Sequence, residues 1–248
     1  LILLSYGYCH FYVLCFFAYY SAYVSSTRVT FFLYISRACP VLHSFPTRRS
    51  SDRQHDDPRL PQMPEAPTLI DFFKLRFAPA NHVLQSARLA RNNGMEEKVV
   101  LACLLHDICV SNLIRTDHGY WCAQMIRPYV DEEIAWAIEA HQALRFFPDE
   151  SVGYAYPEAY IRFFGADYKP EPYIYEAYEK AKNHKWYMTS RLITLNDLYS
   201  FEEGVTVDVD DFADIIGRHF RQPKEGLGFD NSPVAHMWRS MIWPNNFL

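Results

Sequence analysis

The stretch VVLACLLHDI, residues 99–108, constrains this chain most, because it ends a run of apolar residues with His106 and Asp107 side by side. Apolar residues on every side from about Met95 predict a helix that is buried all round. A buried imidazole beside a buried carboxylate needs an ion pair, hydrogen bonds or a metal ion. On a helix of 3.6 residues per turn the two side chains project about 100° apart, so one could ligate a metal ion while the other turns to a second. Taken alone, the dipeptide favours a simple ion pair.

Three further histidines lie on or beside predicted buried stripes: His82, His118 and His141. Apolar residues at the spacing of an α-helix follow His82 and His118, and they precede His141. Asp117 is placed to cap the helix that begins with His118, and Asp131 is placed to cap the helix that carries His141. Each histidine alone is explained as a core residue with a hydrogen-bond partner.

Asp197 joins this set from a later predicted helix, one turn beyond Ile193 in the segment RLITLNDLYSF. Six polar groups therefore lie on or beside buried stripes of five predicted helices: His82, His106, Asp107, His118, His141 and Asp197. So many buried imidazoles and carboxylates are hard to satisfy together without a metal ion.

The order His, His-Asp, His, His and a distant Asp resembles the HD-domain superfamily of all-helical metalloproteins. The resemblance covers roughly Phe72 to Phe201. Within that superfamily the six-residue set is most similar to the branch with the mixed-valent diiron oxygenases that cleave organophosphonates, and more distantly to the inositol oxygenases. The resemblance implies an all-α HD-domain helical bundle with additional C-terminal helices.

The resemblance also implies a dinuclear metal site in which Asp107 bridges two ions. His82, His106 and Asp197 would complete one ion, and His118 and His141 the other. Imidazole and carboxylate without thiolate suit iron, and also Mn, Co or Zn. We expect two divalent or trivalent ions, with iron favoured, and we assign no catalytic residue beyond the ligands.

Arg145 is the one predicted substrate-binding residue. It lies four residues after His141. By the resemblance, the phosphonate-cleaving members of the family carry a Lys at the matching position. A guanidinium there could clamp an anionic group by paired hydrogen bonds. The alternative is a solvated Arg that interacts favourably with the dipole at a helix C-terminus.

Two departures from the oxygenase pattern bear on function. Phe72 stands where those enzymes carry a lid Tyr, and the residues after the His-Asp pair, ICVSN, lack a second His one turn on. We expect an oxygenase-type enzyme that oxidatively cleaves a small anionic, hydroxylated, phosphonate-like substrate. The alternative is a metal-dependent phosphohydrolase of a phosphomonoester or nucleotide, and the third reading is an inert ligand-sensing module.

The N-terminal residues 1–52 do not resemble the rest of the chain. Their first 24 residues carry no charge and are long enough to span a bilayer. However, the segment VLHSFPTRRSSD resembles translated sequencing-adapter sequence, which would make residues 1–52 an artefact of gene calling. We expect a membrane association only if residues 1–36 are genuine. Residues 53–67 are polar and rich in proline and read as a linker, and residues 68–248 form the domain.

Composition limits the remaining function classes. The net charge of −5 and the absence of a basic patch argue against nucleic acid as a partner. Cys103, Cys109 and Cys122 have no CxxC spacing and read as core thiols in the reducing cytoplasm. The aromatic segment 148–184 could roof a pocket, but packing against the core explains it equally well and is expected for most of its rings. The oligomeric state is not predicted.

Overall fold

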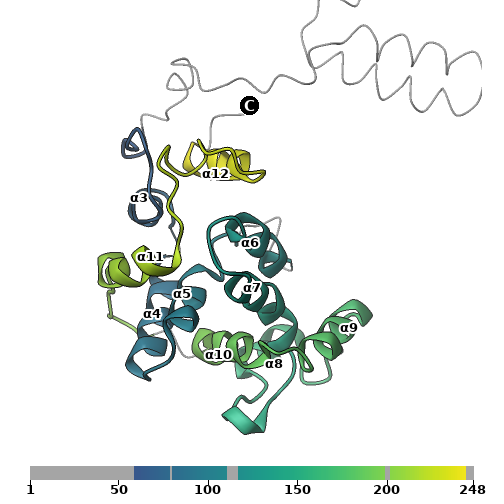
Figure 1. Ribbon diagram of the computed structural model, residues 1–248. Coiled ribbons are helices and arrows are strands. Elements are labelled where there is room, and N and C mark those ends of the chain that lie inside the picture. Colours follow the sequence, from purple (N-terminus) through teal and green to yellow (C-terminus); the bar gives the residue numbers. More distant parts are fainter. Residues whose placement is uncertain (1–58, 79, 111–116, 199–201, 244–248) are drawn as a thin grey trace, which may run out of the picture. The chain divides into compact units, whose positions relative to one another are not determined.

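The computed structural model describes residues 59–78, 80–110, 117–198 and 202–243, and within these residues it contains α-helices and short 3-10 turns but no strand (Figure 1). The α-helices are α3 Leu69–Leu75, α4 Ala80–Asn92, α5 Glu97–Leu105, α6 His118–Ile126, α7 Glu132–Leu144, α8 Glu158–Phe164, α9 Pro172–Ala181, α10 Tyr187–Leu198, α11 Ala213–His219 and α12 Ala235–Ile242. The predicted all-α class is confirmed. None of the described helices combines the length and the apolar character that crossing a bilayer requires.

The predictions for residues 1–52 lie outside the described residues, and the boundaries at residues 52 and 67 stay predictions. In the described part, side chains at Thr68 and Asp71 cap the start of α3. The Thr68 side chain accepts a hydrogen bond from the Asp71 backbone N–H, and the Asp71 side chain accepts one from the Thr68 backbone N–H. This reciprocal pair satisfies two backbone donors that the helix leaves free.

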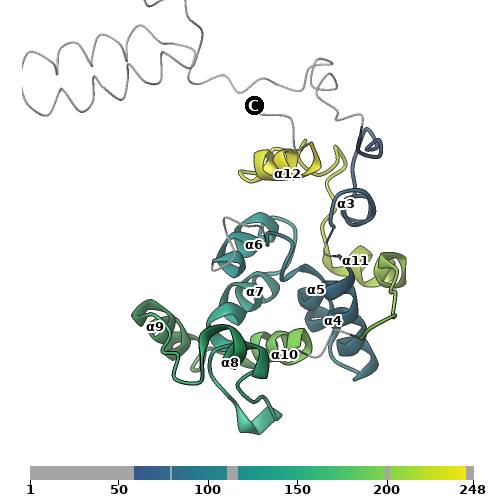
Figure 2. The ribbon, with the colours of Figure 1, turned by 180° about the vertical axis from the view of Figure 1, so that it is seen from behind.

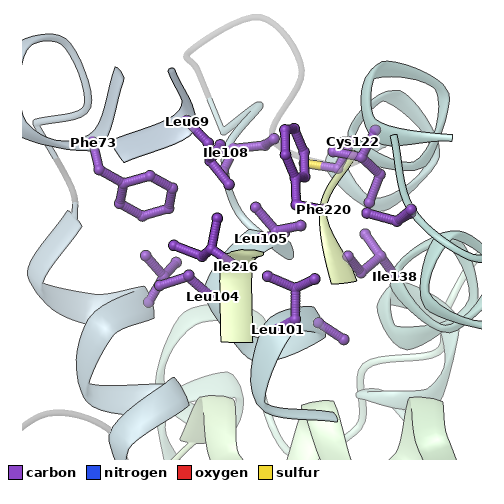
Figure 3. Close-up of a cluster of buried hydrophobic side chains, with 14 of the residues drawn as sticks. Leu69, Phe73, Leu101, Leu104, Leu105, Ile108, Cys122, Ile138, Ile216 and Phe220 are labelled. Atoms are coloured by element: carbon purple, nitrogen blue, oxygen red, sulfur yellow. The ribbon is translucent and has the colours of Figure 1, made fainter. Parts of the chain in front are cut away.

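Helix α5 lies at the centre of the core, as its apolar run predicts. All of its residues from Val99 to Leu105 are buried. Figure 3 shows Leu101, Leu104 and Leu105 within a cluster of buried apolar side chains, among them Ile138 of α7 and Ile216 of α11. Burying a side chain of this size contributes roughly 1.5–3 kcal/mol, so α5 holds several helices together.

Four helices pack side by side around the end of α5. Helices α4 and α7 both contact α5, and α10 contacts α4, α5 and α7 (Figures 1 and 2). Helix α6 packs on α7. The distant α10 and the four helices α4 to α7 therefore meet near His106 and Asp107.

The C-terminal helices add to this core. The Trp238 indole N–H of α12 donates a hydrogen bond of 3.1 Å to the Met125 carbonyl of α6. Phe72 is buried, with its ring 5.3 Å from that of Trp238. Phe72 is therefore a core residue that joins α3 to α12.

Two capping predictions need correction. Asp117 and Asp131 occupy the N-cap positions of α6 and α7, but neither side chain makes a capping hydrogen bond. The Asp131 carboxylate instead lies 3.6 Å from Lys98 Nζ and 3.5 Å from Arg221 Nη1. These cations attract the carboxylate away from the backbone donors of the helix.

The aromatic segment 148–184 folds into a short 3-10 turn, α8 and α9. Most of its rings pack, as expected: Tyr154 is buried, and Tyr156, Tyr160 and Tyr168 pack against a small buried cluster that contains Phe146. None of the residues of α8 itself is fully buried. Helix α8 thus covers the end of α7 without belonging to the main core.

Candidate metal centre

The six polar side chains singled out by the sequence come together in two groups that share Asp107. His82, His106, Asp107 and Asp197 form the first group, and in it one potential ligand atom of each residue lies within 4.8 Å of the others. Asp107, His118 and His141 form the second group by the same measure. Whether they bind metal stays a prediction at this point.

Each of the packed helices contributes to these groups near one of its ends. His82 lies in the first turn of α4, and His141 and Asp197 lie in the last turns of α7 and α10. His106 and Asp107 directly follow α5, and His118 is the first residue of α6. The packing of α4, α7 and α10 on α5 therefore creates the site.

In the first group, Asp197 connects the two histidines. Its Oδ1 lies 2.7 Å from His82 Nε2 and 3.4 Å from His106 Nε2. Asp107 completes the group, with Oδ2 3.6 Å from His82 Nε2 and Oδ1 3.6 Å from His106 Nε2.

In the second group, His118 occupies the middle. Its Nε2 lies 3.2 Å from Asp107 Oδ1 and 3.1 Å from His141 Nε2. Both imidazoles are buried. Ligand atoms that surround one ion at about 2.1 Å and at right angles lie about 3 Å apart, so the spacing in both groups suits a shared ion.

Backbone carbonyls orient two of the imidazoles. The Nδ1–H of His106 donates to the Cys103 carbonyl over 2.7 Å, and the Nδ1–H of His141 donates to the Ile138 carbonyl. Each acceptor lies three residues earlier in the same turn. With Nδ1 bound to a carbonyl, the Nε2 atom of each ring faces the centre, and loss of the Nε2 proton would free its lone pair for a metal ion, which is the usual arrangement of a metal-binding histidine.

Burial and neighbouring charges shift the pKa values of three residues of the centre. Burial lowers the pKa of His141 well below its ordinary value, and the nearby His118 and His106 lower it further, so this ring is neutral. Burial also lowers the pKa of His106, but the charges of Asp107 and Asp197 outweigh it and raise the pKa to about 9. Burial raises the pKa of Asp197, yet hydrogen bonds from His106 and His82 hold it well below its usual range. The carboxylate is therefore ionised and attracts a cation.

The centre has a closed side and an open side. His106, His118 and His141 are 0–3% exposed. The side chains of His82, Asp107 and Asp197 are 14%, 22% and 16% exposed. A small molecule would reach the centre from the side of these three residues.

The donor set fits metal ions of intermediate softness. Four imidazoles and two carboxylates, with no thiolate among them, suit Fe, Mn, Co or Zn. One comparison with known proteins found a match. Residues 80–153 match the family model of the HD domain. This match supports membership of the HD superfamily, whose members are mostly metal-dependent enzymes.

The HD match covers five residues of the centre and stops before Asp197, which the fold brings in from α10. A search of curated proteins found no match. Neither result assigns a reaction or a substrate, so these belong to the proposal below.

Arg145 lies at the C-terminal end of α7, one turn beyond His141. Its guanidinium carbon is 5.1 Å from the centre of the Phe146 ring and 5.6 Å from that of Tyr160. The Nε atom is buried and has no hydrogen-bond partner in the described structure. The side chain is thus packed between aromatic rings, and its role toward a substrate stays a prediction.

Sequence reasoning missed Arg191, a fully buried residue of α10. Its Nη1 donates hydrogen bonds to the carbonyls of Leu144 (3.0 Å) and Phe147 (3.1 Å) at the end of α7. It thereby joins the helix of Asp197 to the helix of His141. The only signal in the sequence was an arginine directly before the apolar residues Leu192 and Ile193.

Proposed function

We propose that the six side chains bind two metal ions bridged by Asp107, and that the protein is a dinuclear metalloenzyme acting on a small anionic substrate. The supporting observation is the membership of Asp107 in both groups. Its Oδ2 faces His82 at 3.6 Å and its Oδ1 faces His118 at 3.2 Å. A carboxylate with its oxygens directed at two sets of imidazoles is suited to bridging two ions.

The residues around the centre have different proposed roles. The buried His106, His118 and His141 exclude water from the inner side, while the side of Asp107 and Asp197 admits substrate. Arg145 would hold the anionic group by charge-assisted hydrogen bonds. Two bound ions would supply Lewis-acid polarisation of a substrate oxygen or, if they are iron, activation of O₂.

For the reaction we propose oxidative cleavage of a phosphonate-like, hydroxylated substrate. The proposal is supported by the set of four His and two Asp without thiolate, and by the cation at the position of Arg145. Metal-dependent hydrolysis of a phosphomonoester or nucleotide is the second candidate, and the HD-domain match favours it. An inert ligand-sensing module fits less well, because all six positions hold a residue that can ligate metal.

Metal analysis with EPR on the full chain tests this proposal. We expect about two ions per chain. Iron content with an EPR signal that develops on partial oxidation would support the oxygenase. Phosphate release from generic phosphomonoesters that depends on Mn or Co would support the hydrolase. Purified protein that takes up no metal from Fe, Mn, Co or Zn would contradict both.

A further inference from the structure

Tyr160 of α8 lies against the residues that follow α7. Its ring centre lies 5.7 Å from that of Phe146 and 5.6 Å from the guanidinium carbon of Arg145. Tyr156, just before α8, lies against it at 5.9 Å between ring centres. Two tyrosine hydroxyls and one guanidinium thus belong to a single cluster of side chains.

Two polar atoms of this cluster are buried and unpaired. Arg145 Nε and Tyr156 Oη have no hydrogen-bond partner in the described structure. A buried donor without a partner costs about 1–3 kcal/mol. A single bound acceptor group could satisfy both of these donors.

The cluster adjoins the metal centre through Arg145, whose backbone N–H donates a hydrogen bond of 3.1 Å to the His141 carbonyl. Burial raises the pKa of Tyr160 to about 12, the charge of Arg145 opposes this, and the charges of Asp197 and Asp107 add to it. Tyr160 is therefore a neutral hydroxyl at physiological pH and can donate a hydrogen bond. Its ring lies beside Arg145, 5.6 Å from the guanidinium carbon.

We propose that Arg145, Tyr156 and Tyr160 form a subsite for the oxyanion of a phosphoryl or phosphonyl group whose substrate is held at the metal centre. The inference rests on the proposed function and deepens it by naming the residues that select the substrate. The three side chains supply N–H and O–H donors, and an oxyanion supplies only acceptors. The aromatic walls exclude water, which strengthens these hydrogen bonds.

Inorganic phosphate is a suitable probe for the subsite. Its binding to the full-length, Mn²⁺-loaded protein is measured by isothermal titration calorimetry, with metal content determined on the same samples. We expect Tyr160→Phe and Tyr156→Phe each to weaken phosphate binding about tenfold, since each removes one hydrogen bond to a charged group. Tyr175→Phe is the matched control, because Tyr175 is 43% exposed on α9. We expect it to bind phosphate like the unchanged protein.

The melting temperature separates a binding role from a structural one. Both variants keep the aromatic ring, so we expect unchanged metal content and a melting temperature close to that of the unchanged protein. Unaltered phosphate affinity in both variants, with two ions still bound, would overturn the subsite and leave the metal centre standing. Failure of the unchanged protein to bind metal would instead remove the proposed function and the subsite together.

Discussion

Asp107 Oδ1 lies 3.2 Å from His118 Nε2, which joins the end of α5 to the start of α6 at the centre of the polar cluster. The His106–Asp107 pair that ends the central apolar helix thus serves both groups of potential ligands. The same carboxylate is the natural target for a test of the dinuclear proposal.

Replacement Asp107→Ala should lower metal content from about two ions per chain to one or fewer, because it removes the residue proposed to touch both ions. Inductively coupled plasma mass spectrometry of the purified variant measures this. Asp210→Ala is the control, since its carboxylate is 56% exposed and pairs with Lys74. Full metal content in Asp107→Ala would count against a bridging role.

Gly119 marks the closest approach of α6 to α7. A Cβ on this residue would lie 2.9 Å from the Ile138 carbonyl oxygen and 3.2 Å from Gln142 Cβ. Because the carbonyl belongs to a helix backbone, Gly119→Ala should push α6 outward and displace the neighbouring His118. We expect destabilisation by about 1–3 kcal/mol in urea unfolding, and weaker metal binding.

Gly217→Ala is the matched control for that variant. Gly217 lies within α11, and an added Cβ would meet no atom within 4 Å. Alanine has the higher helix propensity, so we expect a gain of about 0.5–1 kcal/mol. Equal effects of the two substitutions would refute a steric limit between α6 and α7.

Replacement Arg191→Ala should lower the free energy of unfolding by about 3 kcal/mol or more. It removes the donors of the Leu144 and Phe147 carbonyls and leaves Asp149 without its nearby cation, 3.6 Å away. Urea unfolding followed by circular dichroism measures the loss. The exposed Lys182→Ala, which loses a pair with Glu179 and a contact with the Tyr178 ring, should change stability by less than about 1 kcal/mol.

Asp149 predicts a dependence of stability on pH. Hydrogen bonds from Ser151 and Tyr187, together with the charge of Arg191, lower its pKa below the ordinary 3.8. The unfolded chain therefore binds a proton more readily than the folded one. The stabilisation is complete above the ordinary pKa and is lost as the pH falls through the lower folded value.

Asp149→Asn should remove this contribution. Thermal unfolding between pH 3 and pH 7 measures it, and we expect the variant's melting temperature to fall less steeply with acid than that of the unchanged protein. Parallel curves for the two proteins would show that the carboxylate does not titrate differently on folding.

Sequence and structure contributed differently to the site. The six residues of the cluster were found because imidazoles and carboxylates stood at the ends of apolar, helix-periodic stripes, where burial makes them costly. The surroundings of Arg145 and Tyr160 could not be found in this way. A ring in the segment 148–184 packs or faces a ligand depending on how α8 lies against α7, and no local pattern records that.

The sequence by itself determined the helical class, the central place of residues 99–108 and the identity of the polar groups that need partners, because these depend on periodicity and on the cost of burial within one segment. Only the tertiary structure decided that Asp197 faces His82 at 2.7 Å, that Arg191 holds the end of α7, and that Arg145 packs between aromatic rings. Such relations depend on which helix faces meet, and that is set by the packing of the whole core.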